Sequence, residues 1–177
     1  MNRFLKHIIQ FILFILVQVF ILFRIEPLHQ FIVPYLYFIF LFWLPFNIPR
    51  LSLTFIGFVF GLSLDYFTKT PGLHAAPCTL IAYLRPFLIN ILIRQDGNEL
   101  NFGSPSISSM GFAPYATFAL ILTLIHNGYL VMLEWLQFGS FFYFVGKVLA
   151  TSGVSMLLIL ITELVFYRKD RYRTNTA

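Results

Sequence analysis

Charge is the first thing that this sequence lacks. Only 11% of its 177 residues are Asp, Glu, Lys or Arg, whereas a soluble globular domain carries roughly 25%. Hydrophobic residues make up 59% of the chain, and the mean hydropathy is +0.82. A chain of this composition cannot cover a globular surface with polar groups. The sequence therefore predicts an all-α integral membrane protein whose solvent is the bilayer.

Reactive side chains and their motifs are also scarce. Cys78 is the only cysteine, which excludes a disulfide within the chain. The sequence contains no Walker loop, no His-Glu-x-x-His and no Gly-x-Ser-x-Gly motif. The histidines, at positions 7, 29, 74 and 126, are spread out and do not have metal-ligand spacing. We therefore expect no enzyme activity, no metal and no other cofactor. Membrane topology accounts for the net charge of +5, so we expect no nucleic-acid partner.

Long apolar runs, separated by charged residues, proline or glycine, predict a six-transmembrane-helix bundle in one membrane domain over residues 1–177. The expected helices cover residues 4–23, 28–46, 51–67, 73–93, 112–135 and 141–167. The first run is not followed by the small residues of a signal-peptidase site, so we expect it to remain as a helix. Pro86 predicts a kink in the fourth helix, and a sharp bend there would place residues 87–93 along the membrane surface instead.

Basic residues are distributed unevenly between the two sides of the predicted bundle. Six helices put both ends of the chain on one side, and the side richer in Lys and Arg is normally cytoplasmic. Two basic residues, Arg24 and Lys69, fall opposite the termini, and eight fall on their side. The eight are Arg3, Lys6, Arg50, Arg94, Arg168, Lys169, Arg171 and Arg173. We therefore expect cytoplasmic termini, a flexible cytoplasmic loop over 95–110, and a basic cytoplasmic tail over 168–177 that attracts anionic membrane lipids.

The third predicted helix carries a regular pattern of small and acidic residues. Gly57, Gly61 and Asp65 recur every four residues and therefore share one face. Two glycines at this spacing let a neighbouring helix approach closely, and the carboxylate would lie within reach of a donor on that neighbour. One interpretation is a packing seam capped by an interfacial acid. The other is a specific structural or partner-binding role for Asp65.

Other ionisable residues within the predicted spans are expected to have a partner, because inserting a charged side chain at the bilayer centre costs roughly 2.5 to 3.5 kcal/mol. Arg85 falls within the fourth helix, and His126 and Glu134 fall on roughly the same side of the fifth, about two turns apart. They are too distant to bond each other. We expect them to serve helix packing or hydrogen bonding in the bundle interior, since a proton relay needs a connected chain of titrating groups.

The sixth predicted helix carries two further charges and a second set of small residues. Lys147 is expected to extend to the headgroups, and Glu163 to lie at the interface near the basic tail. Gly146, Ala150 and Gly153 form a small-residue stripe that predicts close packing against another helix.

The segment that joins the third and fourth helices resembles a known family. Its residues Gly61, Asp65, Gly72 and His74, followed by Tyr83 in Leu-Ile-Ala-Tyr-Leu, are similar to the pattern of the rod-shape-determining protein MreD family. Members carry a Gly-x-x-x-Asp motif, a short turn and a Gly-hydrophobic-His motif at this junction. The spacing from His126 to Glu134 is similar to the penultimate helix of Bacteroidetes-like members. Asn127 departs from that pattern, in which a second histidine is expected.

The resemblance implies a non-catalytic scaffold in the bacterial cytoplasmic (inner) membrane. Family members bind MreC and act with MreB filaments, RodA and an elongation transpeptidase, in cell-shape control and lateral peptidoglycan synthesis. It also implies a fold similar to the S-component of energy-coupling-factor transporters. The alternative function is therefore a small-molecule-binding subunit of a membrane transporter, which would require a cavity with several convergent polar groups.

Overall fold

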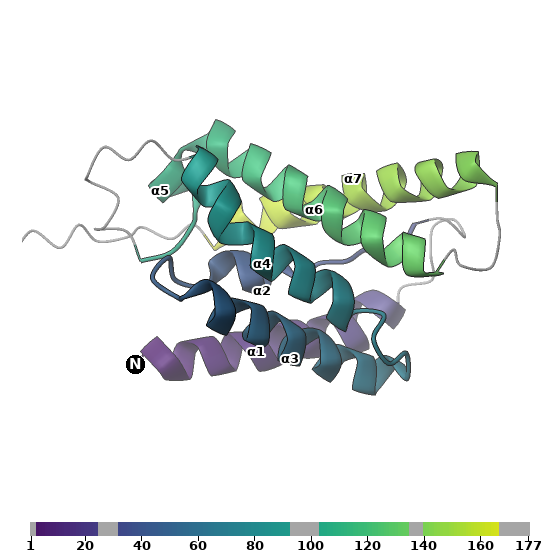
Figure 1. The fold of residues 1–177 in the computed structure, drawn as a ribbon, viewed down its shortest axis with the longest axis horizontal. Coiled ribbons are helices and arrows are strands. Elements are labelled where there is room, and N and C mark those ends of the chain that lie inside the picture. The colour runs from purple at the N-terminus through teal and green to yellow at the C-terminus, as the bar shows by residue number, and fades with distance from the viewer. Residues whose placement is uncertain (1–2, 25–31, 93–102, 135–139, 167–177) are drawn as a thin grey trace, which may run out of the picture.

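A computed structural model of the chain describes residues 3–24, 32–92, 103–134 and 140–166, and its regular elements in these ranges are all helices (Figure 1). Five of them are long and apolar enough to cross a membrane, which indicates a multi-pass α-helical membrane protein. Each lies within three residues of a range predicted from the sequence. They are α1 (Arg3–Phe20, followed by the 3-10 helix η1, Leu22–Arg24), α3 (Arg50–Thr68), α4 (Ala75–Leu92), α6 (Phe112–Glu134) and α7 (Phe141–Val165).

The continuous helix predicted over 28–46 is wrong in the described part of that range. Residues 32–36 have no regular structure, a turn follows, and only α2 (Ile39–Trp43) is helical. Pro34 supplies a local reason, because proline lacks the amide proton that a helix needs and disfavours helical backbone at the preceding residue. The six-helix count is therefore not confirmed.

The segment 32–46 nevertheless runs the length of the bundle, antiparallel to α1 (Figure 1). Ring centroids lie 6.1 Å apart between Phe23 and Tyr35, and 5.4 Å apart between Phe14 and Trp43. Every residue of α2 is buried. Non-helical backbone is tolerated at membrane depth only where protein surrounds it, and here α1, α4 and α7 supply contacts to it.

Helices α3 and α4 form the tightest contact, on the face predicted from the glycine spacing. A Cβ atom on Gly57 would lie 2.7 Å from Cβ of Ala82, and one on Gly61 would lie 2.5 Å from Cα of Ala75. Side chains larger than hydrogen do not fit at either position unless the helices separate. The predicted close packing of this face is therefore present.

Three other expectations about the backbone have different outcomes. Helix α4 continues through Pro86 to Leu92, so residues 87–92 do not turn away along the membrane surface. Within the loop predicted over 95–110, residues 107–110 form the short helix α5 (Ile107–Met110), which a capping box between Ser106 and Ser109 begins. The tail 168–177 lies outside the described residues.

The small-residue stripe of α7 does not pack against another helix among the described residues. A Cβ atom on Gly146 or Gly153 would meet nothing within 4 Å, and both glycines are exposed, while Ala150 is half-buried. The face of α7 that turns inward is polar instead. Its buried residues are Thr151, Ser152, Ser155, Ile159 and Glu163.

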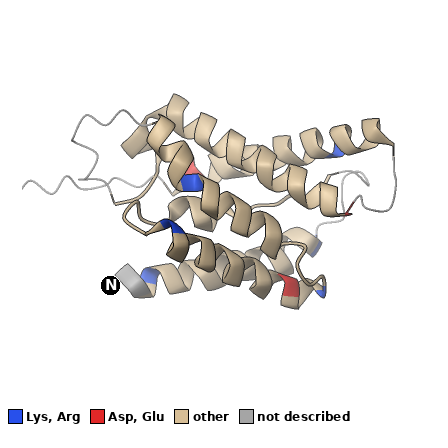
Figure 2. Cartoon of the chain, in the orientation of Figure 1, with Lys and Arg blue, Asp and Glu red and all other residues tan. Residues whose placement is uncertain are grey.

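The helices place charge mainly near their ends. Figure 2 shows long uncharged stretches between blue and red segments that lie mostly towards either end of the bundle. Helix α1 begins at the end where α3 also begins (Figure 1). Helix α7 ends there too, since the ring of Phe166 lies 6.0 Å from that of Trp43.

Candidate functional site

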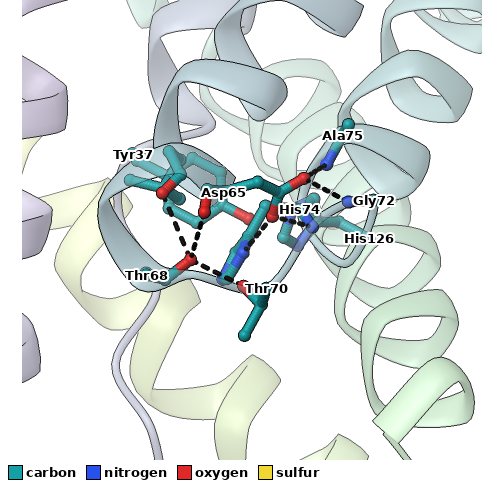
Figure 3. A network of polar contacts seen from close by, with 9 residues as sticks. Tyr37, Asp65, Thr68, Thr70, Gly72, His74, Ala75 and His126 are labelled. Carbon is teal, nitrogen blue, oxygen red and sulfur yellow. Dashed lines mark hydrogen bonds and ion pairs between the residues drawn. The ribbon is translucent and has the colours of Figure 1, made fainter.

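The carboxylate of Asp65 holds the turn between α3 and α4. It accepts hydrogen bonds from the backbone amides of Gly72 (2.9 Å), His74 (2.8 Å) and Ala75 (3.0 Å), and it contacts His74 Nδ1 at 2.8 Å (Figure 3). Asp65 is only 2% exposed. An anion at the beginning of α4 also interacts favourably with the helix dipole. Each hydrogen bond to a charged acceptor contributes about 1.5 to 3 kcal/mol, so this carboxylate strongly stabilises the turn.

The turn itself needs unusual backbone angles. Lys69, directly after α3, has left-handed backbone with a φ of 58°, and Gly72 has a φ of 90°. Glycine reaches such a φ without steric cost, which accounts for its place in the motif. The motif residues Gly61, Asp65, Gly72 and His74 thus belong to one structure: a close helix contact and the turn that closes it.

His126 lies in the bundle interior and joins three elements. Tyr37 Oη is 2.8 Å from its Nε2, its Nδ1 is 3.0 Å from Asn127 Oδ1, and Asn127 Nδ2 donates to Ser152 Oγ at 3.2 Å. Since the amide nitrogen of Asn127 serves Ser152, its oxygen is left to accept from Nδ1–H. A neutral imidazole with Nδ1 protonated then accepts the Tyr37 hydroxyl at Nε2. The expected hydrogen-bonding role of His126 agrees with this geometry.

The ring of Tyr37 packs against two buried histidines, His74 and His126. Its ring centroid lies 5.7 Å from that of His74 and 5.3 Å from that of His126. Figure 3 shows all three side chains gathered beside the α3–α4 turn. Asp65 and His74 of the α3–α4 turn are therefore connected to His126 of α6 through Tyr37, which precedes α2.

Gln18 of α1 supplies hydrogen bonds to the non-helical backbone. Its Nε2 donates to the Pro34 carbonyl at 3.0 Å, and its Oε1 accepts from the amides of Leu36 (3.0 Å) and Tyr37 (3.3 Å). Ser155 Oγ accepts from the Tyr35 amide at 3.2 Å. Gln18 is fully buried. Sequence reasoning missed this residue, although a glutamine flanked on both sides by apolar residues in the second half of α1 is a signal for it.

Arg85 binds the C-terminal end of the segment 32–46. The guanidinium is 2% exposed and donates to the carbonyls of Phe42, Leu44 and Pro45, where α2 ends. Carbonyls at a helix C-terminus carry partial negative charge, so they stabilise a cation there. Arg85 thus has the partner that its place in a transmembrane helix requires, and this partner is a set of backbone carbonyls. Neither ion pair found in the described ranges includes Arg85.

Glu163, which the sequence places at the interface near the basic tail, is only 2% exposed and therefore does not reach water. Its carboxylate accepts from Trp43 Nε1 at 2.8 Å, Tyr115 Oη at 3.1 Å and the Ile107 amide at 3.3 Å. Four elements, α2, α5, α6 and α7, therefore meet at this carboxylate. The inward polar face of α7 explains the burial, because its side chains point to the same interior.

Glu134 and Tyr83 lie apart from this interior. Lys147 Nζ binds Glu134 Oε2 at 2.6 Å, so Lys147 and Glu134 form an ion pair between α6 and α7. His126 and Glu134 consequently serve separate contacts. Tyr83 is half exposed on α4, with the guanidinium of Arg50 5.2 Å from its ring centroid.

The interior polar groups mainly satisfy one another. Among the described residues, only Arg85 Nε and Thr123 Oγ1 are buried side-chain polar atoms without a hydrogen-bond partner. Such a network fixes the path of a non-helical segment and the register of the helices around it. Its chemistry is that of hydrogen bonding and packing.

Comparison with known protein families, with characterised proteins and with solved structures finds no match to this chain. The expected likeness to the S-component fold therefore stays a prediction.

Proposed function

We propose that this chain is a non-catalytic scaffold subunit of the bacterial cell-elongation machinery, of the MreD type. In this proposal it lies in the inner membrane with both termini in the cytoplasm and binds MreC. It supports lateral peptidoglycan synthesis together with MreB filaments, RodA and an elongation transpeptidase. The observation that carries the proposal is the α3–α4 turn, where Gly61, Asp65, Gly72 and His74 act as one structural unit.

A physical role for each motif residue strengthens the resemblance. Gly61 admits the backbone of α4, Asp65 binds the amides that begin α4, and Gly72 adopts the left-handed backbone between them. Three such requirements at fixed spacing are hard to meet by coincidence of composition. They are requirements of one hairpin, so we expect the same pattern wherever this hairpin is used.

A scaffold role also fits the outer surface. Helix association in lipid depends on close packing and on occasional polar bonds, and small residues at the surface permit it. Gly146 and Gly153 leave the outer face of α7 open to a neighbour. Meanwhile the interior polar side chains are directed at the chain's own non-helical segment.

The alternative, a small-molecule-binding transporter subunit, is favoured by one observation. Transporters often build their sites from interrupted transmembrane segments, and residues 32–46 are interrupted in this way. The polar groups beside that segment, including Gln18 and Ser155, already bind its backbone. The scaffold function is therefore the better supported of the two.

The experiment compares Asp65→Ala with Asp65→Asn in a rod-shaped bacterial host that carries this chain in place of its own MreD. Alanine removes every acceptor for the α4 amides, whereas asparagine keeps one oxygen, so we expect wider cells and loss of MreC co-purification chiefly for alanine. Ser63→Ala is the matched control, because its hydroxyl donates only to Val59 O of its own helix.

Vitamin uptake is measured in the same strains. We expect no change in uptake for any variant. Lost uptake with intact MreC binding would refute the scaffold function and support the transporter function. Wild-type levels of MreC binding and normal cell width in folded Asp65→Ala protein would contradict the role given to the turn.

A further inference from the structure

An open groove runs along the outer face of α3 and α4, with a volume of about 720 Å³. Thr54 and Phe58 line it on α3, and Ala76, Thr79 and Tyr83 line it on α4. Gly72, in the turn at the far end of the hairpin, also lines it. The two helices lie side by side over this length (Figure 1), so the groove follows the direction in which a lipid chain lies in a bilayer.

The wall of the groove is apolar in character. Thr54 Oγ1 donates to the Arg50 carbonyl at 2.8 Å, and Thr79 Oγ1 donates to the Ala75 carbonyl at 2.6 Å. Both hydroxyl protons are therefore used within their own helices. Among the described residues, the other polar side-chain groups of the lining are the phenol hydroxyls of Tyr83 and of Tyr129 on α6, and the rest of the lining is apolar.

A positive charge stands at one end of the groove. Arg50, Thr54 and Phe58 are spaced by four residues and share one face of α3. The Arg50 guanidinium carbon lies 5.2 Å from the ring centroid of Tyr83, which lines the groove on α4. Arg50 is exposed, and neither ion pair in the described ranges involves it.

We propose that this groove binds an anionic phospholipid, with one acyl chain between α3 and α4 and the phosphate on Arg50. Arginine binds phosphate oxygens with two parallel hydrogen bonds, and basic sites between transmembrane helices bind acidic headgroups. Tyr83 orients the guanidinium by a cation–π contact. The proposal concerns the leaflet at the Arg50 end of the bundle and does not depend on the scaffold function.

The test uses the full chain in nanodiscs that contain phosphatidylglycerol or phosphatidylcholine, each with a photoreactive diazirine on one acyl chain. We expect phosphatidylglycerol to label peptides of α3 and α4 preferentially. Arg50→Gln should reduce this preference at least about ten-fold, more than the roughly five-fold effect of any one basic residue near an anionic membrane, because it removes a direct charge-assisted bond to the phosphate. Arg50→Lys should retain much of it. Ala76→Phe, which fills the groove, should reduce labelling by both lipids.

Lys6→Gln is the matched control, because Lys6 is an exposed cation of α1 that does not line the groove. Equal losses for Lys6→Gln and Arg50→Gln would mean general attraction to surface charge and would overturn the proposal. So would crosslinks in native membranes that place a partner helix or a second copy in the groove. A folded Ala76→Phe protein with unchanged labelling would also contradict it.

Discussion

Replacing Gln18 by leucine tests the central feature of the fold, the non-helical residues 32–38, whose backbone is held by side-chain hydrogen bonds. The leucine side chain has a similar size but leaves the Pro34 carbonyl and the amides of Leu36 and Tyr37 without their partner. A buried backbone group without a partner costs about 1 to 3 kcal/mol, so three of them cost about 3 to 9 kcal/mol. Even the lower value corresponds to a fall in the melting temperature of roughly 6 to 12 °C.

The assay is thermal unfolding in detergent, followed by tryptophan fluorescence, because Trp43 lies in the affected segment and packs on Phe14. Hydrogen exchange of the Leu36 and Tyr37 amides gives a local measure. Gln10→Leu is the matched control on the same helix, since Gln10 is partly exposed and contacts only His7 among the hydrogen bonds found. We expect its effect to stay within about 0.5 kcal/mol.

The result that would refute the reasoning is equal stability of the two variants. If Gln18→Leu and Gln10→Leu have the same melting temperature, and the amides of Leu36 and Tyr37 stay protected from exchange, then Gln18 does not hold the segment. Faster exchange confined to residues 35–37, with α3 and α4 still protected, would show that the segment opens separately from the hairpin.

Two further predictions concern packing and orientation. Gly61→Ala should destabilise the protein by about 1 to 3 kcal/mol in thermal or denaturant unfolding, because its methyl group would meet Ala75 Cα at 2.5 Å. Gly153→Ala, with open space around it, should be neutral or stabilising by up to about 1 kcal/mol. If Gly153→Ala destabilises the protein more than Gly61→Ala does, the close contact of Gly61 with α4 is contradicted. In a Cys78→Ser background, an impermeant reagent should label Lys69→Cys but not Thr174→Cys in intact cells, and strong labelling at position 174 would overturn the orientation.

Local sequence features predicted much of the α3–α4 hairpin. Gly57, Gly61 and Asp65 were placed on one face by their spacing alone, and the structure packs that face on α4. The turn residues Gly72 and His74 come from the resemblance to a known family and not from helical spacing. The spacing succeeds because helical geometry fixes which residues of α3 share a face, and the short turn after α3 makes α4 the nearest helix to cover it.

The sequence does not identify the partners of the polar residues. It gives no sign that Glu163 binds Trp43, 120 residues away, or that Lys147 binds Glu134 on the adjacent helix. Gln18 was not identified at all. Helical periodicity gives the face on which such a residue lies, but it does not tell which other element covers that face.

Composition and apolar run length by themselves determined that this chain is helical and built for a membrane, and they located five of its long helices. They did not determine the path of residues 32–46. Pro34 prevents a regular helix there, but a non-helical segment survives in lipid only if its backbone groups find partners. Those partners are Gln18, Ser155 and Arg85, from three different helices. Only the tertiary structure brings them together, because hydrogen bonds between distant parts of the chain depend on how all the helices pack.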